Sequence, residues 1–281
     1  MALGLVCDSS LNVPESFLEE YGIIEVPALV IFGPDEVYKN KVDISLETFY
    51  HRFLEKGEQP TTSQPTPAQF VEAYHQTGEK EILCVTVTSR LSGTYNSAVQ
   101  AAKMVEEEGI RVSVWDTRLA SMGGGWQMVH AARMAREGAP LDAILRELEG
   151  VRERSFGFLT VETLTYLARA GRISTTRAML GNMLNIKPIL AFQEGLLNAI
   201  GKERGRRKAK RTLVEHVRTF AAGRPVRVAA VHANIPDEAQ ELLDACKERV
   251  EVVESLVVEV GPVLAALAGP GLLGLAGYVV E

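Results

Sequence analysis

The sequence predicts an α/β fold with two lobes, an N-terminal doubly wound parallel sheet and a C-terminal mixed or antiparallel sheet with helices. The chain has 281 residues, more than the ~150 residues that are typical of one domain. Strand-like and helix-like runs alternate through the first half, as in the βαβ units of a parallel sheet. Short apolar runs of the kind that form hairpins occur in the second half. We therefore expect the lobes to be residues 1–150 and 151–281.

The first half contains strand patterns that alternate with helix patterns. Thr66, Pro67 and Gln69 have the spacing of a helix start, with a threonine N-cap, proline at the first position and glutamine three residues after the cap. Glycines 78, 109 and 138 are each expected to end a helix. The expected strands are 3–7, 23–32, 81–87 and 110–115, and the expected helices are 14–21, 45–55, 66–77, 92–108 and 119–136.

The second half combines helices with more closely paired strands. Gln193-Glu194-Gly195 separates two short apolar runs and indicates a hairpin. The stretch 263–280 is free of charge, but Gly269-Pro270-Gly271 and two further glycines favour a buried turn and strand over a membrane-spanning helix. The expected strands are 156–161, 187–192, 196–200, 226–231 and 250–258, and the expected helices are 141–152, 162–169, a basic one after residue 200, and 236–247.

Composition narrows the classes of function. Thirty basic and 36 acidic residues give a net charge of −6, which argues against bulk electrostatic binding to nucleic acid or to an anionic membrane. Cys7, Cys84 and Cys246 are far apart and lack CxxC spacing, so we expect buried free thiols, no metal site and a cytoplasmic protein. Walker, G-x-S-x-G and HExxH motifs are missing, and the histidines are scattered, so we expect no enzyme.

Two hydroxyl-rich segments could bind an anion. Thr61-Thr62-Ser63 lies among prolines, which hold the chain extended, and hydroxyls hydrogen-bond to a carboxylate or phosphate. Ser92, Gly93 and Thr94 follow a predicted strand and open a predicted helix, where free N–H groups favour anions. The alternatives are a plain surface loop for the first segment and simple helix capping by Ser92 for the second.

Further candidates carry weaker signals. Asp8-Ser9-Ser10 and the segment 116–125 also follow predicted strands, so both are expected at the same crevice, with helix capping as the alternative. Seven basic residues lie in segment 202–211. That segment is read as a solvated helix face or as a docking surface for an acidic partner.

Taken together and in order, these segments resemble the DegV family of bacterial lipid-binding proteins. The resemblance implies a fatty acid such as palmitate, stearate or oleate buried between two lobes, and no cofactor besides this ligand. It also implies that Thr62 and Ser92 hold the carboxylate, with Ser63 as a close neighbour. The matching motifs are Asp8-Ser9-Ser10, Thr62-Ser63-Gln64-Pro65, 89–95, 116–125, 164–173, 184–189 and Gly269-Pro270-Gly271.

Some family members resemble the fatty-acid-binding subunit of bacterial fatty acid kinase, which presents the acyl group to a separate catalytic subunit. Arg172 corresponds to the arginine that assists this partner. Leu267 stands where such members commonly carry a histidine, and Ala170 replaces the first glycine of the Gly-Gly-Arg-Ile pattern. The resemblance therefore implies lipid binding more directly than it implies transfer to a kinase.

Two other functions remain open from the sequence. An acyl or phosphoryl hydrolase or transferase would use Ser92 as its nucleophile and would need a base beside it. A regulatory interaction module would instead use the basic segment 202–211.

Overall fold

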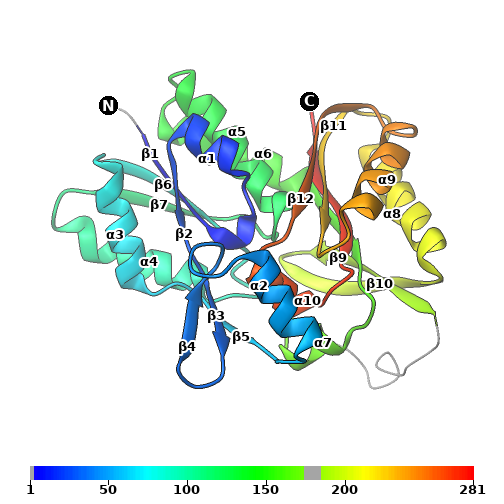
Figure 1. Cartoon of the computed structure of the whole chain (residues 1–281). Coiled ribbons are helices and arrows are strands. Elements are labelled where there is room, and N and C mark those ends of the chain that lie inside the picture. The colour runs from blue at the N-terminus through cyan, green and yellow to red at the C-terminus, as the bar shows by residue number, and fades with distance from the viewer. Residues whose placement is uncertain (1–2, 174–184) are drawn as a thin grey trace.

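The computed structural model describes residues 3–173 and 185–281, which form three sheets (Figure 1). The N-terminal sheet is parallel and has the order β2-β1-β6-β7, and a small antiparallel sheet has the order β4-β3-β5. The C-terminal sheet is mixed and has the order β10-β9-β8-β13-β11-β12, with only β11 and β12 parallel. The predicted fold class is therefore confirmed.

Helices cover both faces of the N-terminal sheet, because successive side chains along each strand point to opposite faces. Val6 of β1 (Gly4–Asp8) packs with α3 (Pro67–Thr77) and α4 (Thr94–Glu106). Leu5 and Cys7 point to the opposite face, toward α5 (Met122–Arg136). The other strands of this sheet are β2 (Ile23–Val26), β6 (Glu81–Thr86) and β7 (Arg111–Asp116), and α1 (Glu15–Tyr21) lies beside α5.

The C-terminal sheet is also covered on both faces. Its outer face packs against α8 (Arg206–Ala221) and α9 (Pro236–Lys247). Its inner face meets α5 and α6 (Leu141–Glu153) through β13, so α5 packs against both large sheets (Figure 1). The strands are β8 (Ser155–Thr160), β9 (Ile186–Gln193), β10 (Leu196–Arg204), β11 (Val226–His232), β12 (Val252–Glu259) and β13 (Leu273–Val279).

The small sheet was not expected. The apolar run 23–32 is broken at Pro27, which has no N–H to donate to a ladder, so that β3 (Leu29–Phe32) leaves the N-terminal sheet. β3 instead pairs with β4 (Glu36–Lys39) and with β5 (Thr61–Ser63). The hydroxyl segment predicted as a loop is thus a short edge strand.

Several helix boundaries differ from those predicted. In the uncharged stretch the expected turn at Gly269-Pro270-Gly271 and the buried strand after it are confirmed. The helix before them, α10 (Pro262–Ala268), was not expected, and proline at its first helical position was a missed start signal. The capping box at Thr66 is confirmed, since its Oγ1 accepts from the Gln69 N–H at 3.3 Å while its own N–H donates to Gln69 at 2.9 Å. α2 (Leu46–Tyr50) continues into a π-helical turn over His51–Glu55, and α7 (Thr165–Arg169) begins three residues later than expected.

Other sequence expectations concern single features. All three cysteines are buried and free. The basic segment is divided between elements, because Lys202 and Arg204 belong to β10 and the helix begins at Arg206. Across 3–173 and 185–281, no helix combines the length and the apolar character needed to cross a membrane. Leu184 of the motif at 184–189 lies outside the described residues.

Glu25 on β2 makes stability depend on pH. Burial raises the pKa of its carboxyl to about 7, and one of its oxygens has no hydrogen-bond partner in the described chain. A raised carboxyl pKa favours the folded state at low pH, and this contribution is lost as the pH rises from the unfolded pKa through about 7. We expect Glu25→Gln to stabilise the protein by about 1–3 kcal/mol at pH 8 and to have little effect at pH 4. Urea unfolding at both pH values measures this, and an equal effect at both would contradict it.

Candidate functional site

A cavity lies between the two lobes at the carboxyl ends of the N-terminal strands. About 1090 Å³ of it is not filled by protein atoms, including space open to solvent. Residues that follow β1, β2, β6 and β7 form one wall, and β8, β9, β11, β13 and α10 form the other. Ligands of doubly wound sheets bind at this edge.

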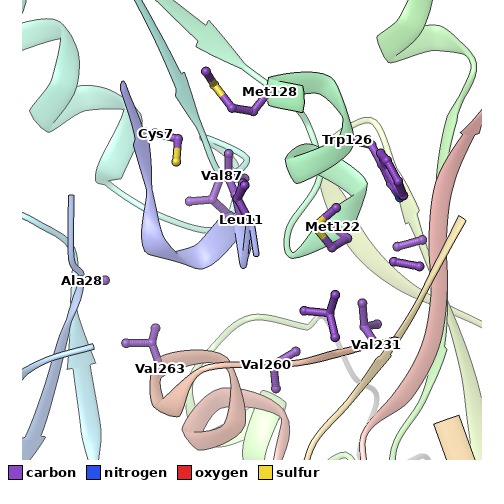
Figure 2. Close-up of a cluster of buried hydrophobic side chains, with 14 of the residues drawn as sticks. Cys7, Leu11, Ala28, Val87, Met122, Trp126, Met128, Val231, Val260 and Val263 are labelled. Atoms are coloured by element: carbon purple, nitrogen blue, oxygen red, sulfur yellow. The ribbon is translucent and has the colours of Figure 1, made fainter. Parts of the chain in front are cut away.

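Most of the wall is apolar. Val87 follows β6, and Val231, Val260 and Val263 come from the C-terminal lobe (Figure 2). Leu11 and Met122 lie near this region on the N-terminal side (Figure 2). The remaining apolar or small lining residues are Ala28, Leu91, Ala120, Gly157, Phe158, Leu159, Leu167, Phe192, Leu197, Leu264, Leu267, Ala268, Leu272, Leu275 and Ala276. Such a surface fits an alkyl chain, because burying it removes apolar area from water.

Pairing of β5 with β3 positions the first hydroxyl segment. Thr62 lies opposite Val30 and Ser63 lies opposite Leu29, and both hydroxyl residues line the cavity. Thr61, in contrast, is exposed and lines a separate surface groove. The strand pairing fixes the backbone, so the two side chains reach the cavity from a rigid support.

The second hydroxyl segment precedes α4. Ser92 lines the cavity, and its hydroxyl shares a 2.8 Å hydrogen bond with that of Thr94 and accepts from the Thr94 N–H at 3.3 Å. Gly93, not Ser92, occupies the N-cap position. Gly93 and Thr94 are not among the described residues that line the cavity. The alternative that Ser92 only caps the helix is therefore wrong, because Gly93 is the N-cap and no side-chain capping bond forms.

Gln64 connects the two segments and was missed as a candidate, although it lies within the Thr62-Ser63-Gln64-Pro65 motif. A Cβ at Gly93 would lie 3.0 Å from the Gln64 side-chain nitrogen. Glycine at this position therefore lets the Gln64 amide pack against the loop before α4. Gln64 also lines the cavity, which adds an N–H donor beside the hydroxyls.

Arg172 joins the lobes at the same end of the cavity. Its Nε donates to the backbone oxygen of Leu91 at 3.0 Å, and a terminal nitrogen donates to that of Ala170 at 2.6 Å. Arg172 is also the one charged side chain among the described residues that line the cavity. It places positive charge near Thr62, Ser63 and Ser92.

Asp8 and Ser9 do not line the cavity, but their hydrogen bonds hold segments that do. The buried Asp8 carboxylate accepts from the N–H groups of Ser10 at 2.8 Å and Val87 at 2.7 Å, and burial raises the pKa of Asp8. The Ser9 hydroxyl accepts from the side chain of Asn40 at 3.0 Å, and Asn40 accepts from the Val263 N–H at 3.1 Å. Ser10 and Ser121, from the other two predicted strand-end segments, line the cavity.

A surface groove adjoins the polar end of the cavity. Thr62, Arg172 and Leu267 line both spaces, so the two are adjacent at these residues. The groove also contains Arg169 and the backbone around Ala170. A ligand held at Thr62 would thus have its head group near the surface.

The enzymatic alternatives would need a base beside Ser92. Ser92 hydrogen-bonds to Thr94, and no histidine or carboxylate in the described chain bonds to it. The described parts of the chain also contain no group of three or more His, Cys, Asp or Glu side chains that could hold a metal ion.

Comparison with known proteins finds similarity to one family, in sequence and in structure. Residues 2–279 match the model of a family described as uncharacterised protein, DegV family. A Thermotoga maritima protein named fatty acid-binding protein is 34% identical over 292 aligned positions, covering 100% of this chain and 99% of the relative. A Thermus thermophilus structure described as fatty acid binding of a DegV family protein has a TM-score of 0.90 at 33% identity, with 100% of both chains covered. A Bacillus subtilis structure described as DegV, a fatty acid binding protein, has a TM-score of 0.87 at 30% identity over 100% of both chains.

Proposed function

Because the chain belongs to the DegV family, we propose that it binds a long-chain fatty acid in the cavity between its lobes. Thr62 and Ser92 hold the carboxylate, with Ser63, Gly93 and Thr94 forming the surrounding backbone and hydroxyl groups. The acyl chain follows the apolar wall. The protein then acts as a lipid carrier without chemistry of its own.

The division of the cavity into a polar end and an apolar remainder carries this proposal. Hydroxyls, an amide and one arginine gather where β5 meets the loop before α4. A carboxylate satisfies these donors, and an arginine strengthens the hydrogen bonds by its charge. A C16–C18 chain buries on the order of 400 Å² of apolar area, worth roughly 10 kcal/mol before the cost of ordering it.

Titration of the delipidated protein tests the proposal. Stearate, palmitate and oleate are expected to bind by calorimetry with a negative heat-capacity change, because apolar surface is buried. Octadecanol, which has the same chain without the carboxylate, is the control and is expected to bind more weakly. Failure of all three acids to bind would overturn the proposal.

We further propose that the carrier presents the carboxylate to a fatty acid kinase catalytic subunit, which supplies ATP and forms acyl phosphate. The adjoining groove supports this, because Thr62 and Arg172 belong both to the cavity and to the surface. Leu267 occupies the border between them and cannot hydrogen-bond to a phosphate. The positive charge of this groove comes instead from Arg172 and Arg169.

Arg172→Ala is expected to lower acyl phosphate formation about tenfold or more at saturating fatty acid. An arginine that contacts an anionic oxygen typically contributes ~1.5–3 kcal/mol. The measurement is hydroxamate trapping with ATP and a purified bacterial fatty acid kinase subunit, with Arg146→Ala, an exposed residue of α6, as the control. No acyl phosphate from the loaded wild-type protein would remove the kinase role and leave lipid binding intact.

A further inference from the structure

Ser121 stands at the start of α5 but does not cap the helix. Its backbone has a φ of 48° and a ψ of −149°, and no side-chain capping bond forms. By contrast, Ser45 caps α2 by accepting from the Thr48 N–H at 3.1 Å. The Ser121 side chain is therefore not used by its own helix.

The hydroxyl of Ser121 is buried without a partner. The residue is 6% exposed, and its Oγ forms no hydrogen bond with any described residue. Buried polar atoms nearly always have a partner, and leaving one unsatisfied is unfavourable. The missing partner is therefore expected to be something that enters the cavity.

The helix start next to Ser121 also has spare donors. α5 has 15 residues, and the N–H groups of Gly124 and Gly125 both donate to the Ser121 carbonyl at 3.0 Å. Among the described residues, no acceptor is found for the N–H groups of Met122 and Gly123, which are both buried. The first turn of a helix carries a partial positive charge, so an oxygen atom is favoured there.

Ser121 and Ser10 belong to the cavity wall and are distinct from the proposed carboxylate site, whereas Met122 and Gly123 are not among the described lining residues. Ser121 and Ser10 both line the cavity, and the Ser121 N–H donates to the Ser10 carbonyl at 2.8 Å. Neither is hydrogen-bonded to Arg172, which donates instead to Leu91 and Ala170. Without a cation beside it, Ser121 suits a neutral oxygen better than a second carboxylate.

We propose that Ser121 and Ser10 recognise an oxygen substituent on the acyl chain, so that the preferred ligands are hydroxy or oxo fatty acids. This inference rests on the proposed function, because it requires the chain to pass along the cavity wall. The Ser121 hydroxyl donates to the substituent, and its oxygen can also accept from a hydroxyl. An unsubstituted chain leaves these groups unsatisfied.

The test compares stearate with 10-hydroxystearate, 12-hydroxystearate and 10-oxostearate on the delipidated chain. The wild type is expected to bind at least one oxygenated acid about three- to tenfold more tightly than stearate, which corresponds to one buried hydrogen bond. Ser121→Ala and Ser121→Gly remove this preference while still binding stearate, and the glycine variant also relieves the positive φ. Ser97→Ala is the matched control, because Ser97 is also 6% exposed but does not line the cavity.

Three outcomes separate the possibilities. Loss of the preference in both Ser121 variants, with Ser97→Ala unchanged, supports the inference. Equal affinities for all four acids in the wild type, as expected if water fills the spot, overturn it and leave fatty acid binding intact. Failure to bind any acid, stearate included, contradicts the proposed function itself.

Discussion

The double variant Thr62→Ala/Ser92→Ala is expected to weaken binding of stearate and oleate by roughly 100-fold or more. Each hydroxyl that donates to a carboxylate contributes ~1.5–3 kcal/mol, because one partner is charged and the site is partly shielded from water. Thr62 is held by the pairing of β5 with β3, and Ser92 by its bonds to Thr94. Neither substitution removes a core side chain, so the fold should persist.

Calorimetric titration of delipidated protein measures this loss. The control is Ser113→Ala/Thr219→Ala, which removes the same two hydroxyl types from positions that do not line the cavity. Octadecanol provides a second control, since its affinity should change much less than that of stearate. An unchanged stearate affinity in the double variant would show that the carboxylate binds elsewhere.

Ala276→Phe is expected to abolish binding of C18 acids while C10 acids still bind. Ala276 lies on β13, is 5% exposed and lines the cavity. A phenyl ring there occupies volume that the chain needs, and close-packed surroundings cannot move aside without strain of ~1–3 kcal/mol. We expect the C18 affinity to fall at least tenfold relative to the C10 affinity.

Ala276→Ser controls for the substitution itself, because it adds little volume at the same position. A series of saturated acids from C10 to C18, titrated against both variants, locates the obstruction along the chain. If Ala276→Phe binds C18 acids as the wild type does, the acyl chain does not run past β13. Thermal unfolding of both variants separates lost binding from lost folding.

Local signals in the sequence predicted much of the fold. The Thr66–Gln69 capping box and the hairpin at Gln193-Glu194-Gly195 depend on neighbouring residues, and both are confirmed. β5 was missed because Thr61, Thr62 and Ser63 become a strand only by pairing with β3, which lies about thirty residues earlier. Helix α10 was missed because glycines on both sides obscured its proline start.

The candidate site likewise has features that local motifs predict and features that only the folded chain creates. Thr62, Ser63, Ser92 and Arg172 could be chosen from motifs, and they do line the cavity, although their roles in binding stay predictions. The bond between Asn40 and Val263 joins residues 223 positions apart, and no local pattern indicates it. Ser121 lay within the predicted segment 116–125, but its missing hydrogen bond depends on the backbone turn at that residue.

Mass spectrometry of lipid extracted from the purified full-length chain tests the central claim most directly. A stoichiometric amount of C16–C18 fatty acid should leave the wild-type protein, and much less should leave Thr62→Ala/Ser92→Ala prepared in parallel. Oxygenated chains among the extracted acids would also support the role of Ser121. Wild-type protein that carries no lipid, and that takes up neither palmitate nor oleate when they are added, would contradict the proposal.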